Sequence, residues 1–142
     1  MITTYAPEVE SVTTAPMNPE IKEQWIARLL DPNAKQGRGL LTSPEGDCCL
    51  GVLCKMAVEA GVIESFDDDG FVAYGSGETH VLPWEVSEWA ELPQGQPDVS
   101  SPLDFSGAAE TPYEKGSPVG LAVLNDYALD FKEIAAVIKE QL

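Results

Sequence analysis

Two adjacent cysteines, Cys48 and Cys49, stand out first among the residues of this 142-residue sequence that could do chemistry. Both fall at the predicted start of a helix, where the helix dipole lowers thiol pKa and favours a reactive thiolate. His80, the only histidine, could then serve as the base of a cysteine-dependent hydrolase or transferase. The alternative, which we favour, is that the flanking apolar residues make these packed structural thiols.

Two patterns suggest metal sites, and both are weak. The three cysteines, Cys54 included, do not return to one face of a helix, and His80 is the only histidine that could join them. The run 67–70, Asp-Asp-Asp-Gly, resembles a calcium loop, but Ser65 and Ser76 occupy the positions of its anchoring carboxylates. We therefore predict no metal site and no cofactor, and we read 67–70 as a hairpin turn.

A glycine-rich basic loop at 35–39 is the best candidate for a small-molecule site. Its glycines free backbone N–H groups, and its two cations could hold a phosphate or carboxylate, such as a nucleotide signal. The alternative is a tight turn in which Arg38 pairs with Asp126 or Glu45, and we favour that alternative. The candidate ligand-binding residues are Lys35, Gln36, Gly37, Arg38, Gly39 and Asp126.

The net charge of −16 is concentrated in one block of the chain. Residues 62–117 hold twelve acids against Lys115 alone. Phosphate contacts need clustered bases, so we expect no direct binding of nucleic acid. Solubility, a basic protein partner or mimicry of nucleic acid would each account for the acidity. The candidate partner-binding residues are Asp67, Asp68, Asp69, Glu85, Glu88 and Glu91.

The elements that must position these residues can be predicted from local signals. The apolar stretch 47–61 predicts a central buried helix, capped by Asp47 and ended by Gly61. Asn18-Pro19 predicts the start of a preceding helix. Asp130 and Glu133 form a capping-box pattern for a final helix, which should pack on the central helix and on Trp25.

The remaining segments predict a compact α+β domain in which helices surround the buried helix and a small antiparallel sheet lies beside them. We expect strands at 62–63 and 71–74, a strand at 80–82, and a helix after Ser117-Pro118. Residues 1–17 are expected to form a flexible arm. Residues 18–142 are expected to form the domain, with a long acidic excursion rich in Pro and Gly at 91–117. No membrane-spanning or signal pattern is present, so a cytoplasmic location is expected.

One combination of motifs resembles a known family. It joins Trp25 and Leu29, the run 36–41 (QGRGLL), the run 48–54 (CCLGVLC) and the run 124–126 (LND) to an apolar repeat in the final helix, Phe131, Ile134, Ala135 and Ile138. The pattern resembles small uncharacterised proteins encoded by tailed bacteriophages and prophages. The resemblance covers about half of the chain and implies an origin, without implying an activity or catalytic residues.

These observations lead to one favoured function and two alternatives. We expect a non-enzymatic phage-type accessory protein that blocks a host component, such as a defence protein or a nucleic-acid-binding protein, through its acidic surface. The host component would be a protein in the host cytoplasm. The first alternative is sequestration of a small anionic ligand at 35–39. The second is cysteine chemistry at Cys48 or Cys49 with His80.

Overall fold

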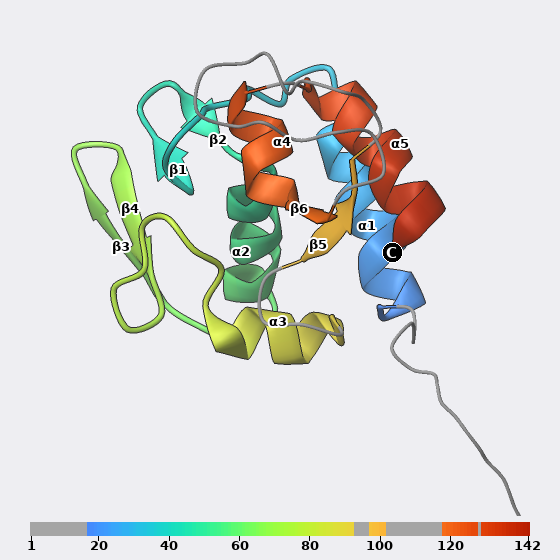
Figure 1. The fold of residues 1–142 in the computed structure, drawn as a ribbon. Helices are drawn as coiled ribbons and strands as arrows, with labels where there is room; N and C mark the ends of the chain where they lie inside the picture. The colour runs from blue at the N-terminus through green and yellow to red at the C-terminus, as the bar shows by residue number, and fades with distance from the viewer. Residues whose placement is uncertain (1–16, 93–96, 102–117, 128) are drawn as a thin grey trace, which may run out of the picture.

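A buried helix, α2 (Cys49–Glu59), forms the centre of the molecule in the computed structural model (Figure 1). The structure describes residues 17–92, 97–101, 118–127 and 129–142. Eight of the eleven residues of α2 are buried, as the apolar stretch predicted. The other helices are α1 (Pro19–Leu29), α3 (Trp84–Ala90), α4 (Leu121–Tyr127) and α5 (Phe131–Gln141).

Local capping signals set the helix ends at three of the predicted positions. The side chain of Asn18 accepts from the N–H groups of Glu20 and Ile21 at the start of α1. Asp130 and Glu133 form the predicted capping box of α5. Gly61 follows α2 with φ of +79°, and the N–H groups of Gly61 and Val62 close a Schellman motif on α2 carbonyls.

The start of α2 differs from the prediction by one residue. Cys48 is the N-cap, and its Sγ accepts from the N–H of Gly51 at 3.4 Å. Asp47 lies instead in strand β2 (Gly46–Asp47), which pairs with β1 (Thr42–Ser43). The Asp47 carboxylate points to the Thr42 hydroxyl, which donates to it at 2.7 Å. Strand pairing therefore overrides the intrinsic preference of Asp for the cap.

The described strands form three separate two-stranded antiparallel sheets. In the second, β3 (Ser65–Asp68) and β4 (Phe71–Tyr74) make the predicted hairpin. Asp69 and Gly70 both have positive φ, 56° and 89°, as a type I′ turn requires. The strand expected at 62–63 begins only at Ser65, and the strand expected at 80–82 does not form.

Two predicted boundaries are wrong, the end of the N-terminal arm and the extent of the 91–117 excursion, because contacts between distant residues determine both. Met17 is 1% exposed and donates its N–H to the carbonyl of Leu142, so it belongs to the core rather than to an arm. Within the expected excursion, β5 (Asp98–Ser100) pairs with β6 (Pro118–Gly120). Pro118 is therefore a strand residue, and α4 begins at Leu121. The rest of the predicted arm (1–16) and most of the excursion (93–96 and 102–117) lie outside the described residues.

Trp25 connects α1 to the central helix. Its side chain is fully buried, and its Nε1 donates to the carbonyl of Cys49 at 2.9 Å. The apolar face of α5 packs against α1, so the two helices cover one side of the core (Figure 1). The result is the predicted compact α+β domain. None of the helices in the described part of the chain combines the length and apolar character that crossing a membrane requires.

Candidate functional site

The thiols at the start of α2 lie inside the core. Cys48 is 4% exposed and Cys49 is fully buried. Burial raises the pKa of Cys48 from its ordinary 9.0 to about 11, and it raises the pKa of Cys49 well above that ordinary value. The desolvation of a thiolate outweighs the helix N-terminus here, so the expectation of lowered thiol pKa values is wrong.

His80 does not share the environment of these thiols. It is exposed, and its Nδ1 bonds to the hydroxyl of the neighbouring Thr79 at 2.9 Å. The Sγ of Cys49 instead donates to the carbonyl of Leu121 at 3.8 Å. Among the described residues, no group of three or more His, Cys, Asp or Glu side chains is placed to hold a metal ion.

Asn125 brings the motif residues of the sequence into one network. It is fully buried, and its Oδ1 accepts from Gln36 Nε2 at 2.8 Å and from the N–H of Cys49 at 3.2 Å. Its Nδ2 donates to the carbonyl of Gly37 and to Asp126 Oδ1, both at 3.0 Å. The amide thus uses both donors and accepts two bonds. We call Asn125 with these partners and Arg38 the Asn125 network.

The 35–39 loop completes this network, so its donors serve the fold. The N–H of Gly37 donates to the carbonyl of Asp47, and the N–H of Gly39 donates to Asp126 Oδ1. Arg38 donates through Nε to the carbonyl of Asn125 at 3.3 Å, at the C-terminal turn of α4. Arg38 therefore contacts backbone carbonyls. The tight-turn alternative instead pairs Arg38 with the carboxylate of Asp126 or Glu45.

These contacts bring the predicted ligand-binding residues together. The loop does contact Asp126, and this contact is what a ligand-binding role for Asp126 required. However, the backbone N–H groups of Gly37 and Gly39 point to partners within the chain. Lys35 is exposed, and its carbonyl accepts from the N–H of Asp47. The arrangement supports a structural role for the loop, and its binding of an anion stays a prediction.

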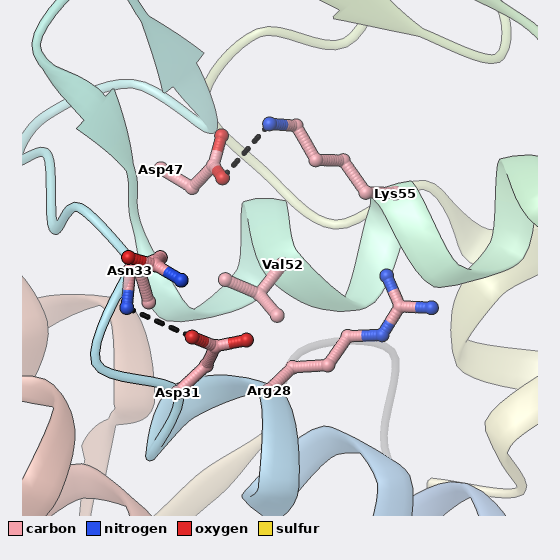
Figure 2. Close-up of a pocket in the computed structure, with 7 residues that line it drawn as sticks. Arg28, Asp31, Asn33, Asp47, Val52 and Lys55 are labelled. Carbon is pink, nitrogen blue, oxygen red and sulfur yellow. Dashed lines mark hydrogen bonds and ion pairs between the residues drawn. The ribbon is translucent and has the colours of Figure 1, made fainter.

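A cleft of mixed charge lies between the end of α1 and α2 (Figure 2). It has a volume of about 270 Å³. Lys55 Nζ lies 3.0 Å from Asp47 Oδ2, and Asp31 Oδ1 accepts from the N–H of Asn33. Arg28 pairs with Glu59. Among the described residues, Arg28, Asp47 and Lys55 are held in ion pairs, whereas the Asp31 carboxylate accepts only from a backbone N–H. The cleft therefore has one unpaired carboxylate and little other uncompensated charge.

A second cleft, of about 420 Å³, separates α2 from the inner face of the β3–β4 hairpin. Tyr74 and Thr42 both line it, and their hydroxyls bond to each other at 2.8 Å. Because the Thr42 proton goes to Asp47, Tyr74 must be the donor in that bond. Burial raises the pKa of Tyr74 to about 12. The lining of this cleft includes Lys55, Val58, Glu59, Asp67, Val72 and Tyr74.

The β3–β4 hairpin presents two aromatic rings to solvent. Phe66 is 54% exposed and Phe71 is 51% exposed. The register pairs Phe66 with Ala73 and Asp68 with Phe71, so all four share one face. Tyr74, on the opposite face, is buried. This shared face could have been predicted from the sequence, because an Asp-Gly turn at 69–70 places Phe66 and Phe71 on the same side of the hairpin.

The predicted partner-binding acids divide into three groups. Asp67, Asp68 and Asp69 are exposed on the hairpin. Glu85, in α3, lies close to Gly75 at the base of the hairpin, and Glu88 is exposed on the same helix. Glu91 ends α3 and accepts from Asn18 Nδ2 at 2.9 Å. Glu91 therefore holds the start of α1, whereas Asp68 shares the face of the exposed rings and Asp67 lies on the opposite face.

Comparisons with known proteins yield one family. Residues 17–142 match a family described as "Domain of unknown function (DUF8296)". The matched region begins at the buried Met17, where the described structure also begins. No curated protein and no solved structure matches the chain.

Proposed function

The chain belongs to the DUF8296 family, and we propose that it is a non-enzymatic binding protein whose β3–β4 hairpin occupies and blocks a basic protein partner. In the phage-type reading of the sequence, that partner is a protein of the host cytoplasm. The observation that carries the proposal is the outward face of the hairpin. Two half-exposed Phe rings lie there with Asp68, and the exposed Asp69 lies at the adjacent turn.

The two kinds of side chain have complementary roles in such an interface. Burying the exposed half of each Phe ring against a partner would contribute about 1 kcal/mol to binding, roughly half the value for a fully exposed ring. The aspartates add to the acidic block at 62–117 and would steer a basic surface toward the hairpin. Aromatic side chains at the centre and a polar rim around them are typical of protein–protein interfaces. A patch that served solubility alone would not need the two rings.

The alternatives have less support. Anion sequestration at 35–39 would have to compete with the bonds that Gly37, Arg38 and Gly39 make within the chain. Cysteine chemistry would need a thiolate at Cys48 or Cys49, and burial favours the neutral thiol at both positions. The hairpin requires no such rearrangement.

The test compares hairpin variants with a matched control. The protein is immobilised, partners are captured from bacterial lysate, and the captured protein is purified and its Kd measured. We expect Phe66→Ala/Phe71→Ala to weaken binding by roughly thirtyfold, because about 2 kcal/mol of burial is lost. The control, Leu30→Ala/Tyr127→Ala, removes large exposed apolar groups elsewhere and should bind like the parent.

A second variant tests the charge. Asp67→Asn/Asp68→Asn/Asp69→Asn keeps the side-chain oxygen that caps Gly70, and Asn tolerates the positive φ at position 69. It should slow association and reduce the salt dependence of binding. Equal affinity of the parent, the Phe variant and the Asn variant for the purified partner would refute the proposal.

A further inference from the structure

The strand register gives the three hairpin aspartates different positions. Asp68 shares the outward face with Phe66 and Phe71. Asp67 shares the inner face with Val72 and Tyr74, and it lines the cleft between the hairpin and α2. The acidic hairpin thus presents carboxylates on both faces, and one of them lies at a cavity.

We propose that this cleft receives an arginine or lysine side chain of the basic partner. The inference rests on the proposed function and names the group that the partner would insert. Val58, Val72 and Tyr74 provide apolar walls for the aliphatic stem of such a side chain. Asp67 provides a carboxylate for its charged end.

The charges of the lining favour a cation. Lys55 is paired with Asp47, and Glu59 is paired with Arg28, which lies outside the lining. The Asp67 carboxylate accepts from the N–H of Gly70 at 2.8 Å and takes part in neither ion pair. Asp67 therefore leaves negative charge at the cleft, in a protein whose net charge is −16.

The cleft is large enough for one side chain. Its volume of about 420 Å³ lies within the range of pockets that hold whole small molecules, so an arginine or lysine side chain would fill part of it. Gly70 at the turn is part of the lining, so the cleft reaches the tip of the hairpin. A partner that covers the outward rings could therefore reach the inner face around the tip.

The experiment titrates the full chain with N-acetyl-arginine amide and N-acetyl-lysine amide, and follows backbone amide shifts by NMR. N-acetyl-citrulline amide is the neutral control. We expect concentration-dependent shifts at Val58, Asp67 and Val72 with one or both cations, and none with the citrulline compound. The comparison of arginine with lysine identifies the preferred side chain.

Two variants test the charge of the cleft directly. Asp67→Asn keeps an oxygen acceptor for the N–H of Gly70, and it should weaken the affinity for the cation by about fivefold. Asp68→Asn makes the same charge change on the outward face, and it should leave that affinity within about twofold of the parent value. Lys55→Gln should strengthen cation binding, because it removes a repelling charge.

The outcomes separate this inference from the proposed function. Equal shifts with the arginine and citrulline compounds would overturn it, as would equal effects of Asp67→Asn and Asp68→Asn. The proposed function would stand in either case if Phe66→Ala/Phe71→Ala still weakened partner binding as predicted above. Loss of the proposed function would appear instead as a Phe variant that binds the partner normally.

Discussion

The Asn125 network and the β3–β4 hairpin use polar residues in opposite ways. In the network, Asn125 is fully buried and makes four hydrogen bonds within the chain. On the hairpin, three aspartates and two Phe rings face solvent. Both regions follow from recognisable sequence patterns, a glycine-rich loop and an Asp-Gly turn.

This difference shows that residue type alone does not separate fold from function. The basic Gly-rich loop has the composition of an anion site, yet its donors bond to α4 and to Asp47, just before α2. The hairpin has the composition of an ordinary turn, yet it exposes apolar area that the core could have buried. Burial and hydrogen-bond partners distinguish the two regions, and stability measurements can test the distinction.

Gly51→Ala should have the largest effect, because it disrupts packing beside the Asn125 network. A Cβ at this position would lie 1.8 Å from the carbonyl oxygen of Leu41, and a backbone atom cannot move away cheaply. We expect a loss of more than about 4 kcal/mol, seen by urea denaturation or as failure to fold. Gly61→Ala, which has open space around it, should cost only about 1 kcal/mol. Similar losses for the two variants would contradict the role given to Gly51.

Asn125→Ala tests the network itself. It removes the acceptor of the Cys49 N–H and the donor to the Gly37 carbonyl, and leaves buried groups without these partners. We expect the free energy of unfolding to fall by about 3 kcal/mol. Asn33→Ala, at an exposed position, should change it by less than about 0.5 kcal/mol. If the two alanine variants were equally stable, the network would not be a determinant of the fold.

The free energy of unfolding should fall at alkaline pH, because Cys48 and Tyr74 are buried. Folding raises the pKa of Cys48 from 9.0 to about 11 and that of Tyr74 from 10.0 to about 12. The folded state then holds these protons more tightly than the unfolded state. Stability is therefore fully present below about pH 9, and it declines as the pH rises toward about 12. Tyr74→Phe should flatten the decline above pH 10, as followed by denaturation at several pH values, and an unchanged slope would argue against this assignment.

Phe66→Ala/Phe71→Ala should have the smallest effect on stability. Both rings are half exposed, so their joint removal should lower the free energy of unfolding by no more than about 2 kcal/mol. Thermal or urea denaturation measures this directly. A loss of several kcal/mol would mean that the rings support the fold, and the contrast with the Asn125 network would disappear.

Features encoded within a few residues could be predicted from the sequence. The Asn18 cap, the Asp130–Glu133 capping box, Gly61 after α2 and the turn at 69–70 depend on short-range steric and hydrogen-bonding rules. The same locality explains the correct central helix, whose apolar run is longer than any other in the chain.

Features that depend on distant partners could not be predicted in this way. Ser117-Pro118 is a plausible helix start, but pairing with β5 places Pro118 in a strand. Met17 follows a segment of arm-like composition, and only its contact with the far end of the chain reveals it as core. Asn125 bonds to residues nearly ninety positions away, so its hydrogen-bond network could not be predicted from local sequence patterns.

The contact between Met17 and Leu142 has a practical consequence. A single backbone hydrogen bond of 3.1 Å joins the two ends of the domain. In Figure 1 the C-terminus lies on the opposite side of the molecule from the β3–β4 hairpin. A short linker could therefore close the chain into a circular permutant, or the domain could be inserted into a loop of a carrier protein, with the hairpin left pointing away from the junction.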